Sequence, residues 1–223
     1  MRTLAIGDIH GCFTALRALE AAVPIVDDDR VVTLGDYIDR GPDSASVIEW
    51  LIDRDRRGGL VAIRGNHEIM IQQAKQSERA RGCWLQSGGD ATLASYATDG
   101  GSGRMEDVPE AHWRFLESTR PWFETETHFF VHANAYYDRP LADQSDLMLY
   151  WEKFSEYAPA HESGKIMVCG HTPRRNGRPL SVGHAICIDT WAYRGEWLTC
   201  LDVDSGRYWQ ANHRGETRTG RLA

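Results

Sequence analysis

The chain has 223 residues, of which 42% are hydrophobic, which is enough for one substantial core and short for two independent ones. Its formal net charge of -7 argues against a polynucleotide-binding groove, because nucleic-acid-binding proteins usually carry excess lysine and arginine. The five cysteines form no CxxC pair, and the first residues resemble neither a signal peptide nor a membrane span, so we expect a cytoplasmic protein with reduced thiols.

Five short apolar runs are each followed closely by a residue that can bind a metal ion. In chain order they are residues 3–6 before Asp8, 31–34 before Asp36, 60–63 before Asn66, 129–131 before His132 and 166–169 before His171. Runs of this length and composition are typical of buried strands. Because open α/β sheets form their sites at the carboxyl ends of strands, we expect the five side chains to meet at one edge of the protein.

Helix-like stretches at residues 13–22 and 44–57 separate the first three runs, so the first half of the chain alternates strand and helix. This alternation predicts an α/β fold. The segment at about 69–124 has a mainly helical pattern with a break at Gly88 and Gly89, and we expect it to form a cap-like insertion. We expect the whole chain to form a single domain.

The composition changes again after Gly183, where short β-type runs occupy residues 185–188 and 197–203. A turn with the sequence DSG closes the second of these runs. We expect this end of the chain to complete a second sheet.

Three short motifs carry the first four candidate metal ligands. GDIHG places Asp8 and His10 two residues apart, so that both side chains of an extended loop project to the same side. GDYIDRG offers Asp36, whose two carboxylate oxygens can bridge a pair of cations about 3.5 to 4 Å apart. RGNHE adds the amide oxygen of Asn66, a neutral ligand for a hard or borderline metal.

His132 and His171 complete a set of six mixed oxygen and nitrogen ligands, which favours Mn, Fe or Zn over calcium. The alternative for each residue is structural, because an aspartate after glycine is often a turn residue and a lone histidine is often a hydrogen-bonded core residue. The shared placement of these residues after apolar strands favours the metal interpretation. We therefore expect two divalent metal ions, with Mn in first place.

Five motifs follow one another along the chain, namely GDIHG, GDYIDRG, RGNHE, a VHA strand end and GHTP. Together they resemble the phosphoprotein phosphatase family of calcineurin-like metallophosphoesterases, and GGDATLASY at residues 88–96 is similar to its short bacterial and phage serine/threonine phosphatase branch. The resemblance implies a two-layer β-sandwich flanked by helices, with a dinuclear metal site at strand ends. It also implies two ligand sets that share one carboxylate, namely Asp8, His10 and Asp36 for the first metal and Asp36, Asn66, His132 and His171 for the second.

The residue types and the resemblance predict the same reaction, which is hydrolysis of a phosphate ester by in-line attack of a hydroxide that bridges the two metals. His67 is the one motif histidine without a metal role, and we expect it to donate a proton to the leaving oxygen. Asp39 would orient His67 and keep it protonated. Arg40 and Arg64 would grip nonbridging phosphate oxygens in the bidentate geometry of guanidinium.

The sequence departs from the family pattern at the rim of the expected cleft. Many relatives carry an arginine in a stretch resembling WxRxxF, where this chain has LYWEKF and Trp151 takes the place of the arginine. Trp191 stands where relatives usually have the glycine of IDTG. We hypothesise that Trp151 and Trp191 form an aromatic wall beside the metals, suited to phosphotyrosine or a nucleotide. The alternative is that both are packing residues.

These observations lead to three candidate functions. The first is a metal-dependent phosphomonoesterase that acts on phosphorylated proteins or small phosphoesters. The second is hydrolysis of dinucleoside tetraphosphates, by enzymes that share the GDIHG, GDYIDRG and GNHE motifs. The third is a catalytically silent binding module, which the presence of all six ligands disfavours.

Overall fold

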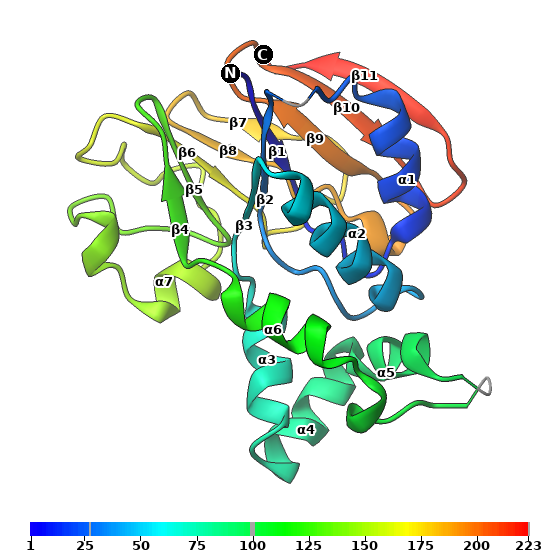
Figure 1. Cartoon of the computed structure of the whole chain (residues 1–223). Coiled ribbons are helices and arrows are strands. Elements are labelled where there is room, and N and C mark those ends of the chain that lie inside the picture. The colour runs from blue at the N-terminus through cyan, green and yellow to red at the C-terminus, as the bar shows by residue number, and fades with distance from the viewer. Residues whose placement is uncertain (27, 99–100, 223) are drawn as a thin grey trace.

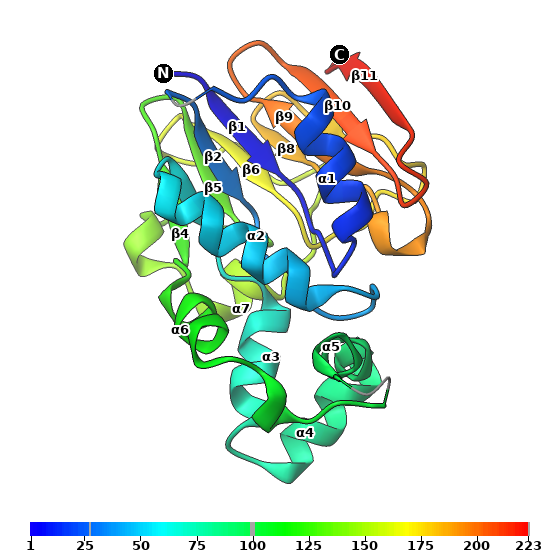
Figure 2. The same ribbon diagram turned by 45° about the vertical axis from the view of Figure 1, so that its right-hand side comes forward.

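The computed structural model of the protein describes residues 1–26, 28–98 and 101–222. Two mixed β-sheets pack face to face, and helices cover the outer side of the first sheet and extend beyond one end of the sandwich (Figure 1 and Figure 2). The predicted α/β sandwich flanked by helices is therefore confirmed.

The first sheet has six strands in the order β11-β10-β9-β1-β2-β3. Its strands are, in chain order, β1 (Thr3–Ile6), β2 (Arg30–Thr33), β3 (Leu60–Ala62), β9 (Leu198–Asp202), β10 (Arg207–Ala211) and β11 (Thr217–Arg221). The strands β1, β2 and β3 run parallel, and α1 (Phe13–Ala22) and α2 (Ser44–Arg57) connect them. The alternation of strand and helix in the first half of the chain thus builds the parallel part of this sheet.

The second sheet has five strands in the order β4-β5-β6-β8-β7. They are β4 (Trp122–Glu124), β5 (His128–Val131), β6 (Ile166–Cys169), β7 (Leu180–Ser181) and β8 (Ala185–Cys187). Because β5 and β6 run parallel, His132 after β5 and His171 after β6 leave the same edge of the sheet. The short helix α7 (Asp146–Tyr150) packs on the outer face of this sheet.

The alternation of side chains along each strand produces the layers. In β1, Ala5 points into the space between the sheets, where it packs in one cluster with Val32 and Phe130. Its neighbours Leu4 and Ile6 point the other way and pack with side chains of α1 and α2. All five side chains are almost completely buried. Burial on both faces explains why β1 is nearly continuous in apolar residues instead of alternating with polar ones.

A mainly helical segment lies between β3 and β4 and extends beyond the sandwich (Figure 1). It contains α3 (Asn66–Ala74), α4 (Glu78–Trp84), a π-helical turn (Leu85–Gly89), α5 (Asp90–Tyr96), a 3₁₀ turn (Met105–Asp107) and α6 (Glu110–Ser118). Residues 99–100 lie outside the described part of the chain. Two further 3₁₀ turns, Leu141–Asp143 and Ala192–Arg194, lie elsewhere in the chain. The organisation as one domain, residues 1–223, with a cap at about 69–124 stays a prediction.

The expected place of the C-terminal strands is only partly right. Residues 185–187 form β8 in the second sheet, but β9 pairs antiparallel with β1 in the first sheet and continues into β10 and β11. A β-type run does not predict its own partner, because the pairing depends on contacts across the whole fold. No helix among the described residues is long and apolar enough to cross a membrane.

Candidate active site

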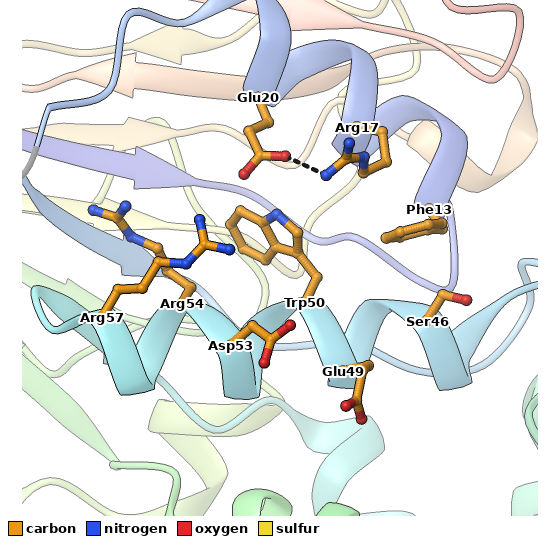
Figure 3. Close-up of a pocket in the computed structure, with 9 residues that line it drawn as sticks. All are labelled: Phe13, Arg17, Glu20, Ser46, Glu49, Trp50, Asp53, Arg54 and Arg57. Carbon is orange, nitrogen blue, oxygen red and sulfur yellow. Dashed lines mark hydrogen bonds and ion pairs between the residues drawn. The ribbon is translucent and has the colours of Figure 1, made fainter.

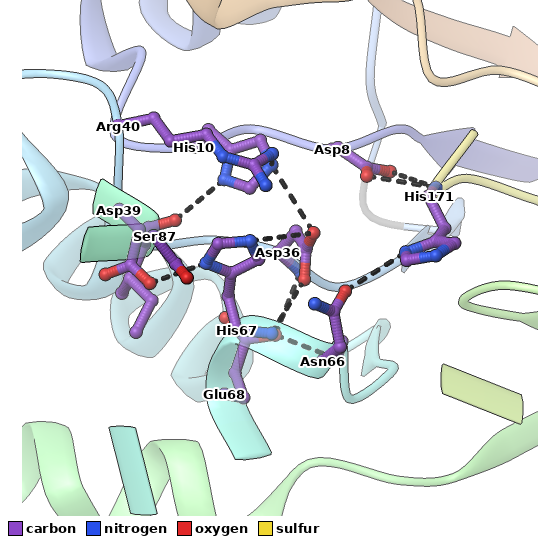
Figure 4. A network of polar contacts seen from close by, with 12 residues as sticks. Asp8, His10, Asp36, Asp39, Arg40, Asn66, His67, Glu68, Ser87 and His171 are labelled. Carbon is purple, nitrogen blue, oxygen red and sulfur yellow. Dashed lines mark hydrogen bonds and ion pairs between the residues drawn. The ribbon is translucent and has the colours of Figure 1, made fainter. Parts of the chain in front are cut away.

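The five residues that follow the apolar runs meet at one end of the sandwich (Figure 4). The loops after β1, β2, β5 and β6 supply Asp8, Asp36, His132 and His171, respectively. The first residue of α3 supplies Asn66. Because these strands are parallel neighbours within their sheets, their carboxyl ends lie close together in the sandwich.

His132 is at the centre of one group of polar atoms. Its Nε2 atom lies 3.0 Å from Asn66 Oδ1 and 3.2 Å from His171 Nδ1. The same atom lies 3.4 Å from Asp36 Oδ1. Asn66 Oδ1 in turn lies 3.1 Å from His171 Nδ1. The four side chains therefore face one common point.

Backbone carbonyl groups decide which nitrogen of each histidine carries the proton. His132 Nδ1 donates to the carbonyl of Leu34 at 2.8 Å, and His171 Nε2 donates to that of Trp151 at 3.1 Å. Because a carbonyl can only accept, these nitrogens hold the hydrogen and the opposite nitrogens present lone pairs. The atoms that face one another are therefore all acceptors. Acceptors at such distances repel one another unless a cation lies among them.

Asp36 joins this group to a second one around His10. Asp36 Oδ1 lies 3.4 Å from His132 Nε2, and its other oxygen, Oδ2, lies 3.4 Å from His10 Nε2. His10 Nδ1 donates to the carbonyl of Ile38 at 2.8 Å, so Nε2 presents a lone pair here too. A carboxylate with one oxygen toward each group has the geometry of a bridging ligand.

The histidines of the two groups are held in their neutral form. Burial lowers the pKa of His10 and that of His132. Burial, with the neighbouring His132, lowers the pKa of His171 to about 4. A neutral imidazole is the form that binds metal ions. The donor set therefore fits a pair of divalent cations.

Asp8 lies beside these groups, and its carboxylate is turned toward the loop after β6. Both of its oxygens accept the backbone N–H of His171, at 3.0 and 3.2 Å. Gly170 leaves room for this contact, because a Cβ atom there would overlap with Asp8 Oδ1. Burial raises the pKa of Asp8, and the carboxylates of Asp189 and Asp36 add to this effect. Clustered buried carboxylates likewise fit the binding of cations.

His67 is held by a buried carboxylate. Its Nδ1 atom donates to Asp39 Oδ2 at 2.6 Å, and its Nε2 atom lies 4.0 Å from Asp36 Oδ2 (Figure 4). Burial acts to lower the pKa of His67, but the charge of Asp36 and the hydrogen bond to Asp39 outweigh it and raise the pKa above its ordinary value. A ring nitrogen of His67 lies within 4.8 Å of possible ligand atoms of His10 and Asp36. Its raised pKa distinguishes it from the neutral histidines nearby.

The two candidate phosphate-binding arginines lie in different surroundings. Arg40 Nη1 is 2.7 Å from His10 Nε2, and the guanidinium lies 4.7 Å from the ring centre of Tyr193. Arg64 is turned toward the end of α6, where its Nε and Nη2 atoms donate to the hydroxyl and carbonyl of Thr119 at 3.0 and 2.7 Å. The structure therefore brings Arg40 to the ligand groups and holds Arg64 against α6.

Two buried carboxylates of this region were not predicted from the sequence as site residues. Glu68 accepts the backbone N–H groups of Asp36 and Tyr37 at 2.8 and 2.9 Å, and burial raises its pKa to about 7. Asp189 accepts the backbone N–H of Trp191 at 3.0 Å, and burial raises its pKa to about 7 as well. The signal for Asp189 is present in the sequence, because it too follows an apolar run, that of β8.

Backbone strain is concentrated in this region. Six non-glycine residues of the described chain have positive φ angles, namely His10 (45°), Asp36 (50°), Asp39 (74°), Arg40 (70°), His171 (60°) and Trp191 (64°). Such conformations cost about 1–3 kcal/mol each and persist where the surroundings enforce them, often at functional sites. Glycine would adopt the angle at Trp191 at lower cost than tryptophan does.

Trp151 contacts the ligand cluster directly, whereas Trp191 reaches it through Tyr193. Trp151 is 40% exposed, and its carbonyl accepts the hydrogen bond from His171. Trp191 Nε1 donates to the Tyr193 hydroxyl at 3.1 Å, and the Tyr193 ring packs edge-on against His10 with ring centres 5.0 Å apart. Among the described residues, the two tryptophans make no ring contact with each other. A continuous aromatic wall stays a hypothesis.

A separate hollow of about 260 Å³ lies between α1 and α2 (Figure 3). Charged side chains line much of it, and Arg17 Nη1 pairs with Glu20 Oε2 there at 2.8 Å. None of the predicted site residues lines this hollow. Its mixture of charges differs from the group around His132, where acceptor atoms face one another.

Comparisons with known proteins agree with this geometry. Residues 1–205 match the family model for calcineurin-like phosphoesterase. The chain is 32% identical to serine/threonine-protein phosphatase 1 of Salmonella typhimurium, over 89% of this chain and 90% of the relative. It is 26% identical to the asymmetrical bis(5'-nucleosyl)-tetraphosphatase PrpE of Bacillus subtilis, over 87% of each chain.

The fold is also similar to a crystal structure, that of a cold-active protein-tyrosine phosphatase from a psychrophilic Shewanella species. The TM-score is 0.63 at 17% sequence identity, over 98% of this chain and 80% of the other. This likeness supports the fold, and the family match supports the chemistry of the donor set. The chain therefore belongs to the calcineurin-like phosphoesterase family of hydrolases, in the bacterial branch that contains serine/threonine protein phosphatases.

Proposed function

We propose that the protein is a metal-dependent phosphomonoesterase of the protein phosphatase type, which hydrolyses phosphate esters on protein side chains. The pairing of His67 with Asp39 carries this proposal. The leaving group of a serine or threonine phosphate is an alkoxide, which needs a proton as it departs. A buried histidine with a raised pKa at the edge of the ligand groups is suited to supply that proton.

We assign the metal ligands in two sets that share Asp36. They are Asp8, His10 and Asp36 for the first ion, and Asp36, Asn66, His132 and His171 for the second. A mixed set of carboxylate, amide and imidazole ligands favours Mn, with Fe and Zn as alternatives. When bound, two such cations polarise the phosphate ester and lower the pKa of the attacking water.

The residues around the ligands orient the substrate and move the proton. Arg40, beside His10, binds a nonbridging phosphate oxygen and offsets the negative charge of the transition state. Asp39 accepts the Nδ1 hydrogen of His67, so that the Nε2 hydrogen is the one available to the leaving oxygen. The phosphate-binding role of Arg64 stays a prediction, because its guanidinium is bonded to Thr119.

Hydrolysis of dinucleoside tetraphosphates is the second candidate function. The similarity to PrpE of Bacillus subtilis favours it, and so do two hollows that Arg40 lines. These measure about 450 and 560 Å³, and Tyr193 and Arg194 line both. Arginines and an aromatic ring could bind a phosphate chain and a base. However, a departing nucleotide phosphate is less basic than an alkoxide and depends less on His67.

A direct comparison of substrates tests the proposal. Purified protein loaded with Mn is assayed for kcat/KM on a phosphoserine peptide, a phosphotyrosine peptide and diadenosine tetraphosphate, with a chelated sample as control. We expect a phosphopeptide to be preferred by more than about tenfold, or about 1.4 kcal/mol of transition-state discrimination. A preference for the dinucleotide would instead support the second candidate. Loading with Fe and Zn in parallel identifies the metal that supports the highest rate.

We also propose a cytoplasmic location. The five cysteines are free thiols, and four of them are buried. Reduced cysteines are typical of proteins of the cytoplasm, whereas exported proteins commonly pair theirs. Fractionation of cells that express the protein tests this location.

A further inference from the structure

The carboxylate of Asp39 is fully buried and bonded on every side. Its Oδ2 atom accepts the His67 Nδ1 hydrogen at 2.6 Å and the Trp84 Nε1 hydrogen at 2.8 Å. Its Oδ1 atom accepts the Thr92 hydroxyl at 2.6 Å. The Thr92 oxygen also accepts the backbone N–H of Asp39 at 2.8 Å. Trp84 and Thr92 thus fix both the carboxylate and the strained backbone of the residue that holds His67.

Both residues come from the helical segment and not from the sandwich. Trp84 ends α4 and Thr92 lies in α5, and a π-helical turn with glycines at 88 and 89 separates them. The carbonyl of Gly88 accepts the backbone N–H of Arg40 at 3.0 Å. Gly89 packs against the indole of Trp84, where a Cβ atom would overlap with the ring. The two glycines therefore let this turn approach the loop that carries Asp39 and Arg40.

We propose that Trp84 and Thr92 are positioning residues for the proton donor. Each occupies a lone pair of the Asp39 carboxylate, so that the remaining acceptor position is directed at His67 Nδ1. Without these two donors, the carboxylate is free to rotate, and His67 loses its fixed orientation toward the leaving oxygen. This inference rests on the proposed role of His67 as proton donor. It gives the helical segment a part in the reaction itself, beyond that of a cover.

The test compares leaving groups that differ in their need for a proton. Thr92→Val keeps the side-chain shape and removes the hydroxyl that bonds both the carboxylate and the backbone N–H of Asp39. Trp84→Phe removes the indole N–H that bonds Asp39 but also leaves a smaller ring, so Thr92→Val is the cleaner of the two variants. With a phosphoserine peptide, we expect kcat to fall by about 10- to 100-fold in each variant, which is typical when a supporting hydrogen bond of a site is removed. With 4-nitrophenyl phosphate, whose phenolate leaves readily without a proton, we expect kcat close to that of the wild type. Equal losses with both substrates would overturn the inference.

Two matched variants control for general damage to the helix. Thr92→Ser keeps the hydroxyl and should retain most of the activity lost in Thr92→Val. Ser95→Ala removes another hydroxyl of α5, which accepts the backbone N–H of Ala45 and does not reach Asp39. It should leave kcat unchanged on both substrates. Metal content and thermal melting are measured for every variant, and loss of activity with loss of metal would count against a positioning role.

A double-mutant cycle separates this inference from the proposed function. If Thr92 acts through His67, then His67→Asn combined with Thr92→Val is no slower on the phosphoserine peptide than His67→Asn alone. Additive losses would overturn the positioning role and leave the proton donor in place. If His67→Asn itself slows both substrates equally, the proton-donor role fails, and the positioning role fails with it.

Discussion

The β-sandwich and the helical segment contribute differently to the active site. The sandwich supplies five of the six candidate metal ligands from loops at the ends of neighbouring parallel strands, and the first residue of α3 supplies the sixth, Asn66. The helical segment supplies the hydrogen bonds that hold Asp39, from residues 45 and 53 positions away along the chain. Ligand placement therefore follows from short motifs, whereas orientation of the proton donor depends on how a distant segment folds back on the sandwich.

Of these variants, Asp36→Asn should lower the activity most, because it changes a candidate metal ligand supplied by the sandwich. Asp36 directs one oxygen toward each ligand group, so its loss should remove both metals. We expect kcat/KM to fall by at least about 10³-fold on every substrate, including 4-nitrophenyl phosphate. Metal content by mass spectrometry and steady-state kinetics check this. The matched control is Asp204→Asn, an exposed aspartate in the turn before β10. A variant that keeps both metals would contradict the bridging role.

The next effect is expected from His67→Asn, which removes the proton donor but should leave both metals bound. With a phosphoserine peptide, we expect kcat to fall by about 10²- to 10⁴-fold, the usual contribution of general acid catalysis. Because the pKa of His67 is raised, the protonated form persists above the ordinary histidine range and activity declines as the pH rises through that pKa. This alkaline decline should be absent from the pH–rate profile of His67→Asn. Its persistence there would assign the proton to another group.

Gly89→Ala tests the contact between the two regions from the helical side. An added Cβ overlaps with the indole of Trp84, so the ring must move away from Asp39. We expect a loss of about 1–3 kcal/mol in the free energy of unfolding, together with slower turnover of the phosphoserine peptide. Gly82→Ala in α4 is the matched control, because nothing lies within 4 Å of the added Cβ. It should stabilise the helix by about 1 kcal/mol. Similar melting curves for both variants would show that the turn accommodates the added methyl group without loss of stability.

The smallest effect is expected in the hollow between α1 and α2, which lies outside both contributing regions (Figure 3). Arg17→Ala removes a largely exposed ion pair with Glu20. We expect a change of at most about 0.5 kcal/mol in the free energy of unfolding and an unchanged kcat/KM. Chemical denaturation and the phosphopeptide assay check this. A marked loss of activity would show that this face takes part in substrate binding.

The sequence allows the ligand edge to be predicted, since Asp36, His132 and His171 each follow an apolar run whose strand is parallel to its neighbour. It does not allow Trp84 to be recognised, because a buried tryptophan in a helix has the same pattern whether it packs or donates a hydrogen bond. The contact to Asp39 depends on the π-helical turn, which no periodicity predicts. The pairing of β9 with β1 is missed for a related reason, since strand partners are set by contacts far apart in the sequence.

The strained backbone has a consequence for laboratory evolution. Arg40, which is exposed, adopts a positive φ angle that glycine would adopt at less cost, by roughly 1 kcal/mol. A library selected only for heat resistance should therefore accumulate glycine or asparagine at this position. Such variants would become more robust as their turnover disappears, because thermal resistance and catalysis compete for the same residue. Selection must include a phosphate-release screen to keep both properties.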